Sequence, residues 1–270
     1  MAVRRLLTLV FVFSVVMWPK VNAGAHGPYC EDWSAYEDGL HRLFARWRYL
    51  LGTNAGQAAG GKATIVRQPI TAEPISGDLN HVDHVFWLHT DSYSAYRAWV
   101  EVGIRDMYDS SPVLSTPLHK EGFYWGRLAT IGGSQEQWAW WWINSLSLPA
   151  TGSYVRYKIK WDSAADGYDV FIARSGSDSL HYIDTAKYNN LRPWQLQAGG
   201  EANFCDGNDG DSQYNSMAPA YSVDWDWIEP DGTYHAIAVT EAPQSNLPAH
   251  MGLMNNNQTA CFHMNTSAWC

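Results

Sequence analysis

The stretch 154–161, YVRYKIKW, decides the fold class because apolar and basic residues alternate along it. On an extended chain its two sets of side chains would point to opposite faces: Val155, Tyr157, Ile159 and Trp161 against Arg156, Lys158 and Lys160. A period of two residues indicates a β-strand with one buried face and one face in water. Half-buried strands of this kind are typical of antiparallel sheets.

Similar alternation extends outward from this stretch in both directions. It predicts further strands over 97–105, 168–173, 195–204 and 233–240. Turn-forming pairs separate the strands, among them Asp166-Gly167 and Asp231-Gly232. Because no strand–helix–strand rhythm follows, we predict an all-β protein, an antiparallel β-sandwich of the jelly-roll, concanavalin-like type over residues 63–270.

The first residues have the features of a secretion signal. Arg4 and Arg5 precede an apolar run over 6–18, and the small residues at 21–23, VNA, are typical of a cleavage site. The run is shorter than the roughly 20 apolar residues that a membrane span needs. We therefore predict a signal peptide over 1–23, a secreted, extracellular protein, and no membrane contact after cleavage.

Residues 30–51 predict an amphipathic helix, because apolar residues recur there at steps of three and four. These residues are Trp33, Tyr36, Leu40, Leu43, Phe44, Trp47, Leu50 and Leu51. The following stretch over 52–62, GTNAGQAAGGK, is small and glycine-rich, which favours a flexible connector. We expect an N-terminal helical segment and linker over 24–62, acting as a lid or as a removable pro-segment.

Four cysteines follow the signal, and an even number in an exported chain favours two disulfide bonds. Three connectivities are open. We favour Cys261–Cys270, which closes a short C-terminal loop, together with Cys30–Cys205, which would tie the N-terminal segment to the sandwich. No C-x-x-C pair occurs, so a zinc site built from these cysteines is not expected.

Composition and charge exclude several classes of protein. The 270 residues are 46% hydrophobic and 17% charged, which excludes a disordered chain. A formal net charge of −9 disfavours a nucleic-acid partner, because phosphate binding needs clustered basic residues. No phosphate-binding, dinucleotide-binding or zinc-hydrolase motif is present, so we expect no cofactor and no metal. We expect a monomer.

Two glutamates are the leading catalytic candidates. Alternation in the strands over 97–105 and 195–204 places both Glu101 and Glu201 on the face away from the core, with Trp99, Gln195 and Gln197 as neighbours. Paired carboxylates near apolar rings can acquire different pKa values, so that one acts as a base and the other as an acid. The alternative is a pair of solvated strand carboxylates.

Four short motifs resemble neprosin-type glutamic peptidases. They are W-V-E-V-G over 99–103, F-Y-W over 123–125, A-G-G-E over 198–201, and His-Met-Gly over 250–252. The resemblance implies a β-sandwich in which Glu101 and Glu201 activate a water molecule for peptide hydrolysis in acid. Trp125, in the second motif, is then a candidate substrate-binding residue beside Trp99, Gln195 and Gln197. The eqolisin-type glutamic peptidases, which pair a Gln with a Glu, are a related possibility.

Aromatic residues support a different function, that of a non-catalytic carbohydrate-binding, lectin-like sandwich. The chain holds 15 Trp residues, and the stretch over 135–143, QEQWAWWWI, would place Trp138, Trp140 and Trp142 on one strand face. Indole rings stack on sugar rings. The alternative is that these rings fill the core, as large aromatic residues usually do.

Three further acidic or histidine motifs remain open. Asp224, Asp226 and Glu229 resemble the acidic strand of jelly-roll glucanases, which predicts a glycan-cleaving enzyme or an acidic edge strand. The stretch over 206–211, DGNDGD, could bind Ca²⁺, although an acidic turn is the simpler interpretation. His81 and Asp83 would share one strand face while His84 takes the other, which argues against zinc.

Overall fold

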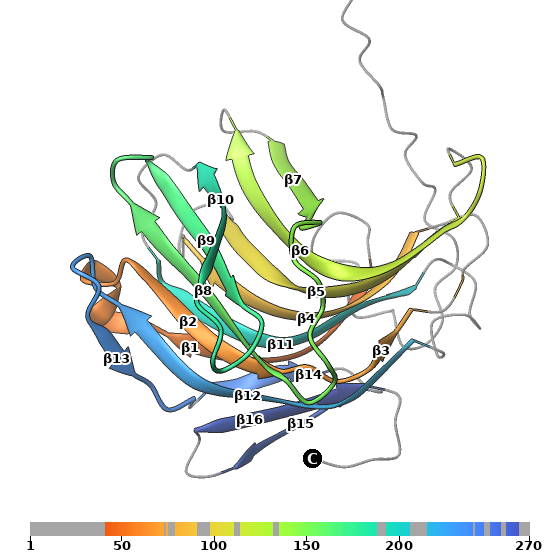
Figure 1. Ribbon diagram of the computed structural model, residues 1–270. Coiled ribbons are helices and arrows are strands. Elements are labelled where there is room, and N and C mark those ends of the chain that lie inside the picture. Colours follow the sequence, from red (N-terminus) through yellow and green to blue (C-terminus); the bar gives the residue numbers. More distant parts are fainter. Residues whose placement is uncertain are drawn as a thin grey trace, which may run out of the picture.

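The computed structural model describes residues 41–264 except 73, 75–78, 91–97, 111–113, 132–134, 188–192, 206–214, 240, 246–248 and 255–257. The described chain is almost entirely β-structure, arranged as two curved antiparallel sheets (Figure 1). The only helix in this part of the chain is a short 3₁₀ helix, η2 (Gly52–Gly56). No helix among the described residues is long and apolar enough to cross a membrane.

The first sheet, here called sheet A, has seven strands. Their order across the sheet is β14 (Glu241–Ser245), β1 (His41–Leu50), β11 (Gln195–Cys205), β4 (Leu79–His89), β5 (Trp99–Asp109), β6 (Leu118–Ile131) and β7 (Gln135–Trp142). Every ladder between neighbours is antiparallel.

The second sheet, sheet B, has nine strands. Its main order is β10 (His181–Lys187), β9 (Gly167–Ala173), β8 (Tyr154–Asp162), β2 (Gly60–Val66), β12 (Ser216–Ile228), β16 (Thr259–Met264) and β15 (Ala249–Met254). Two short strands, β3 (Ile70–Thr71) and β13 (Tyr234–Ala236), pair with β12.

The main hydrophobic core lies between the two sheets. Sheet A contributes residues such as Phe86, Val102 and Phe123, and sheet B contributes Tyr157 and Ile159, all at most 1% exposed. On β8 the burial alternates as the sequence predicts, with the basic side chains on the outer face. The predicted antiparallel β-sandwich is confirmed, and the strand predictions over 97–105, 154–161, 168–173 and 195–204 fall on β5, β8, β9 and β11.

The predicted helix over 30–51 is wrong for its described part, which is strand β1. Alternation was present there as well: Ala45 and Trp47 face the core, while Arg46 and Arg48 lie on the other face. Strand β1 pairs with β11 on one side and with β14 on the other, so cross-strand hydrogen bonds outweigh the helical pattern. Residues 30–40 lie outside the described residues.

The division at residue 62 also needs correction. Strand β1 is an interior strand of sheet A, and β2, which begins at Gly60, pairs with β8 and β12 in sheet B. The stretch predicted to be a flexible linker therefore contains η2 and the start of β2. Since a sheet cannot lose an interior strand without exposing both neighbours, a removable segment would have to end before residue 41.

The predictions for the signal peptide, for Cys30 and for Cys270 concern positions outside the described residues. Cys261, on β16, is completely buried and disulfide-bonded. Its backbone carbonyl also accepts a hydrogen bond from Trp47 Nε1 at 3.3 Å, which links the two sheets. The proposed connectivity, including the pairing of Cys205, stays a prediction.

Candidate functional site

A second cluster of buried side chains covers the face of sheet A that points away from the main core. It contains Val85, Trp87, Trp99, Tyr124 and Leu128, with Trp140 and Trp142 packed against it. We call this face the site face. Strands β4, β5, β6 and β7 all contribute, because the odd-numbered residues of β4 and β5 pair in register with even-numbered residues of β6 and β7.

Both candidate glutamates lie on the site face. Glu101 pairs with Trp87 of β4, and Glu201 pairs with Asp83 of the same strand. Trp87 and Asp83 are four residues apart and so point to the same side of β4. Each glutamate is only 1% exposed. The alternative of two solvated strand carboxylates is therefore excluded.

Glu101 is held by two indole rings. Its Oε2 atom accepts hydrogen bonds from Trp87 Nε1 at 3.0 Å and from Trp99 Nε1 at 3.2 Å. The neighbouring strand leaves room for the carboxylate because Gly126 has no side chain. A Cβ atom at Gly126 would lie 2.7 Å from Glu101 Oε1 and 3.2 Å from Trp140 Cβ. Position 126 must therefore be glycine if Glu101 is to keep this position.

Glu201 lies beside a buried ionic network. His81 Nε2 is 3.8 Å from Glu201 Oε1 and 3.5 Å from Asp83 Oδ2. Asp83 accepts two hydrogen bonds from Arg105, from Nε at 2.8 Å and from Nη2 at 2.5 Å. It also accepts one from the Tyr124 hydroxyl at 3.0 Å. The carboxylate of Asp83 is thus compensated, as a fully buried charge requires.

Electrostatic coupling connects this network to both glutamates. Burial, and then the negative charges of Asp83, Glu101 and Glu201, raise the pKa of Tyr124 well above its usual value. Burial lowers the pKa of Arg105, but the negative charge of Asp83 and the coupling to Tyr124 outweigh it and raise the pKa above its usual value. Tyr124 therefore remains a neutral donor and Arg105 a permanent cation.

His81 is harder to protonate here than a histidine in water. Burial and the positive charge of Arg105 lower its pKa, and they outweigh the opposing effects of Asp83 and Glu201. A neutral imidazole can donate to one carboxylate or accept from one protonated carboxyl, but it adds no charge to the site.

Two glycines lie in the register row between the two glutamates. Gly199 and Gly103 flank Val85, in line with Tyr124 on β6. A Cβ at Gly199 would meet the carbonyl oxygen of Ala45 on β1, and one at Gly200 would meet the side chain of Met217. These glycines allow close packing of the sandwich.

The other predicted site residues divide between the two faces. Trp99 contacts Glu101 directly, and Gln195 and Gln197 lie on the site face of β11, each 3% exposed. Trp125 does not join them, because it pairs with Val102 and packs in the main core. It stacks there on Trp141 at 4.5 Å between ring centres. The structure therefore places Trp125 apart from the other three candidate substrate-binding residues.

The tryptophan-rich stretch also divides by alternation. Trp140 and Trp142 pack on the site face, and the guanidinium of Arg105 lies 4.9 Å from the centre of the Trp140 ring. Trp141 points the other way and is 42% exposed. Trp138 lies in β7, and its side chain is outside the described part. Most of the described aromatic surface of this stretch is thus used in packing.

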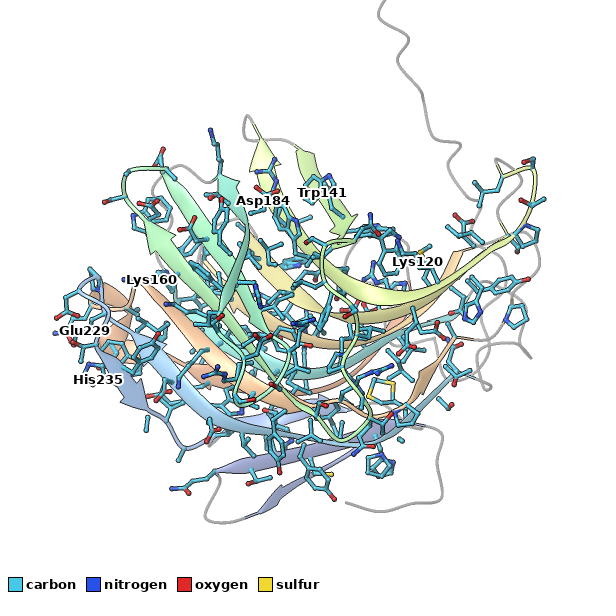
Figure 2. All side chains as sticks on the ribbon, viewed as in Figure 1. Lys120, Trp141, Lys160, Asp184, Glu229 and His235 are labelled. Atoms are coloured by element: carbon cyan, nitrogen blue, oxygen red, sulfur yellow. The ribbon has the colours of Figure 1, made fainter. Side chains whose placement is uncertain are left out.

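The glucanase-like motif does not form a pair of carboxyl groups. Asp226 Oδ2 is 2.7 Å from Lys62 Nζ, and Glu229 Oε1 is 2.8 Å from His235 Nε2 (Figure 2 labels Glu229 and His235). Asp224 is exposed and has a left-handed backbone, with φ of 53°, at an irregularity of β12. These contacts favour an acidic strand end over a glycosidase centre.

The histidines of β4 lie on opposite faces, as alternation predicted. His84 points into the main core, where its ring meets Phe262 edge-on at 5.7 Å, while His81 and Asp83 face the site. No cluster of three metal-ligating side chains occurs among the described residues. The candidate Ca²⁺ loop over 206–211 lies outside them.

Three members of the site, Trp87, Arg105 and Tyr124, were given no site role from the sequence, and Asp83 was considered only as a metal ligand. Arg105 lies four positions after Glu101 on a predicted strand, so alternation alone could have placed it on the same face. Trp87 follows the same rule on β4, where alternation had already placed His81 and Asp83 on one strand face. Tyr124 was quoted in a motif but given no role. What the sequence could not show is which strands are neighbours, and hence that these residues meet Glu201.

Comparisons with known proteins found similarity in structure only. No family model and no curated protein matches the chain. One similar solved structure is scytalido-glutamic peptidase with a transition-state analogue inhibitor, with 9% identity, a TM-score of 0.46, and coverage of 83% of this chain and 98% of that chain. Another is SCP-B, a member of the eqolisin family, with 8% identity, a TM-score of 0.39, and coverage of 83% and 97%.

A third similar structure belongs to a different kind of protein. It is the CBM2 module of the Lactobacillus casei BL23 phage J-1 evolved Dit, with 12% identity, a TM-score of 0.32, and coverage of 91% of this chain and 82% of that chain. At such low identities and TM-scores these likenesses do not indicate an activity.

Proposed function

We propose that this protein is a hydrolase of the glutamic peptidase type, as the neprosin-like motifs suggest, with Glu101 and Glu201 as its catalytic residues. The observation that carries the proposal is the burial of two carboxyl groups on one face of one sheet, both coupled to Tyr124. Buried acids with defined charge partners are typical of catalytic sites. The single-face arrangement is what two groups acting on one peptide bond require.

The hydrogen bonds favour different roles for the two glutamates. Two indole N–H groups donate to Glu101 Oε2, and donors of this kind stabilise the ionised form of a carboxyl group. Glu201 pairs across the strands with Asp83, and a neighbouring negative charge favours the protonated form of a carboxyl group. We therefore assign Glu101 as the general base and Glu201 as the general acid.

In the proposed reaction, Glu101 takes a proton from a water molecule while the water oxygen bonds to the carbonyl carbon of the scissile peptide. Glu201 then donates a proton to the leaving nitrogen as the carbon–nitrogen bond breaks. Gln195 or Gln197, on the same face of β11, could donate to the oxyanion that forms in between.

The register of the strands sets the distance between the two glutamates. Strands β5 and β11 flank β4, so the backbones of the two glutamates are about 10 Å apart across the strands and about 13 Å apart along them in a flat sheet. This separation is too wide for a direct carboxyl–carboxyl contact. The proposed mechanism therefore requires the peptide group and its water molecule to lie between the two side chains.

The test replaces each glutamate by glutamine, which keeps the shape and removes the titrating group. We expect Glu201→Gln and Glu101→Gln each to reduce cleavage of a peptide library at pH 3–5 by at least 100-fold, the usual share of acid–base catalysis. Glu121→Gln, on the outer part of β6, is the control and should cleave normally. Unchanged cleavage by Glu201→Gln would eliminate the proposal, as would a wild-type protein without peptidase activity.

A further inference from the structure

The outer face of sheet B carries a continuous row of side chains across five strands. Tyr182 on β10 pairs with Phe171 on β9, Phe171 pairs with Lys158 on β8, Lys158 pairs with Lys62 on β2, and Lys62 pairs with Asp226 on β12. The inward neighbours of these residues on β8, β9 and β2 fill the main core, so the row itself faces outward.

Aromatic and cationic groups are in contact along this row. The rings of Tyr182 and Phe171 meet at 5.8 Å, and Lys158 Nζ lies 5.0 Å from the centre of the Phe171 ring. Tyr234, on β13, lies above the two lysines: its ring centre is 4.9 Å from Lys62 Nζ and 5.7 Å from Lys158 Nζ. The row therefore presents two aromatic rings next to two lysines, with the ring of Tyr234 over the lysines.

The aromatic side chains of the row are not there to fill the core. Tyr182 is 57% exposed and Tyr234 is 45% exposed, although each offers a large apolar ring. Lone exposed aromatics are common, but neighbouring rings on one outer sheet face indicate a binding surface. The ring of a tyrosine is well suited to this, because it combines apolar area with a polar end.

The charge of the row also contrasts with that of the whole chain. The protein has a formal net charge of −9, yet Arg156, Lys158 and Lys160 occupy successive outward positions of β8 (Figure 2 labels Lys160). Lys62 is neutralised by Asp226 at 2.7 Å. For Lys158, the contacts found among the described residues are the two aromatic rings, and no carboxylate of that part of the chain forms an ion pair with it.

We propose that this row binds an extended polysaccharide that carries carboxylate groups. The exposed rings would stack on the faces of sugar residues, and Lys158, flanked by Arg156 and Lys160, would pair with the carboxylates. Five strands span about 19 Å, the length of several consecutive sugar residues. The surface lies on the sheet opposite the glutamates and does not depend on the proposed peptidase activity.

Affinity gel electrophoresis with the full-length protein tests the proposal, using polygalacturonate as the acidic glycan and hydroxyethylcellulose as the neutral one. We expect polygalacturonate to retard the wild-type protein and the neutral glycan not to do so. Tyr182→Ala and Lys158→Ala should each weaken binding at least fivefold. The matched control is Tyr154→Ala, which removes a tyrosine that is 53% exposed at the end of β8 and outside the row.

Three outcomes would overturn the proposal: no retardation of the wild-type protein, equal retardation by the neutral glycan, or a loss in Tyr154→Ala as large as that in Tyr182→Ala. Because these side chains face outward, circular dichroism should show that all variants fold. Glu201→Gln should bind polygalacturonate as the wild-type protein does. A failure of glycan binding would therefore leave the peptidase proposal untouched, and the reverse also holds.

Discussion

Replacing His84 by leucine should make the protein more resistant to unfolding in acid while changing little at neutral pH. His84 is completely buried on the core side of β4, and neither ring nitrogen finds a hydrogen-bond partner among the described residues. Burial, together with the positive charge of Arg67, lowers its pKa from 6.5 to about 3. The native protein therefore keeps this histidine uncharged in mild acid, while the unfolded chain protonates it.

The sign and size of the effect follow from proton linkage. Well above pH 6.5 the histidine is neutral in both states, so proton binding does not change the free energy of unfolding. As the pH falls from 6.5 towards 3, only the unfolded state gains the proton, so the native state loses stability. At pH 4.5, two units below the unfolded pKa, the loss is about 2.7 kcal/mol. His89, whose pKa is also lowered to about 3 by burial and by Arg46, would add a similar loss.

Urea denaturation at pH 7.0 and at pH 4.5 measures this difference. We expect His84→Leu, a change of similar volume, to alter the free energy of unfolding by less than about 1.5 kcal/mol at pH 7.0. The difference in free energy of unfolding between the variant and the wild type should shift in favour of the variant by about 2.7 kcal/mol between pH 7.0 and pH 4.5. Val82→Ala, a core variant of the same strand without a titrating group, should be destabilised equally at both pH values.

An unchanged pH dependence in His84→Leu would refute the reasoning, because it would mean that the histidine is protonated equally in both states. The result also bears on function. Two such histidines cost about 5 kcal/mol at pH 4.5, a large part of the 5–15 kcal/mol that stabilises a typical domain. Cleavage should therefore be measured nearer pH 5 than pH 3, because the native state loses more stability as the pH falls.

Three further predictions concern the site and the sheet. Gly126→Ala should displace Glu101 and reduce peptide cleavage at least tenfold, with little change in melting temperature. Gly122→Ala is the control: its added Cβ would lie 3.3 Å from the Trp142 ring, and the variant should retain activity. Equal activity of the two variants would contradict the placement of Glu101. Arg105→Met should reduce the free energy of unfolding in urea by about 3–5 kcal/mol, because it leaves the buried Asp83 charge unpaired, and a loss below 1 kcal/mol would argue against the ion pair. A chain that begins after β1 should fail to give a cooperative thermal transition, because β1 is an interior strand of sheet A. A chain that begins at residue 41 keeps β1 and should fold. A stable protein without β1 would show that this strand is dispensable.

Alternation predicted the faces of the strands with good accuracy. Glu101 and Trp99 were placed on one side of the strand and Val100 and Val102 on the other, and the structure agrees. The same rule placed Glu201 correctly on β11. It works because successive side chains of a strand point in opposite directions whatever the strand pairs with.

The failures have a different physical origin. The segment around Trp47 carries apolar residues that fit both a helical stripe and an alternating strand, and only the presence of β11 and β14 on its two sides decides between them. Trp125 was given a site role from its motif, but its neighbour Tyr124 points to the site and Trp125 points to the core. A local pattern can rank two conformations, but the hydrogen bonds and burial that select one come from distant segments.

The sequence by itself determined the class of fold and the face on which each acidic residue of the site lies, since both depend on a period of two along one strand. The tertiary structure alone decided which strands are neighbours. Because β11 and β5 flank β4, Glu201 and Glu101 lie on the same face of one sheet. The same strand order places Arg105, Asp83, His81 and Tyr124 around them. Strand order is set by non-local packing and hydrogen bonding, and the spacing of residues along one strand carries no record of it.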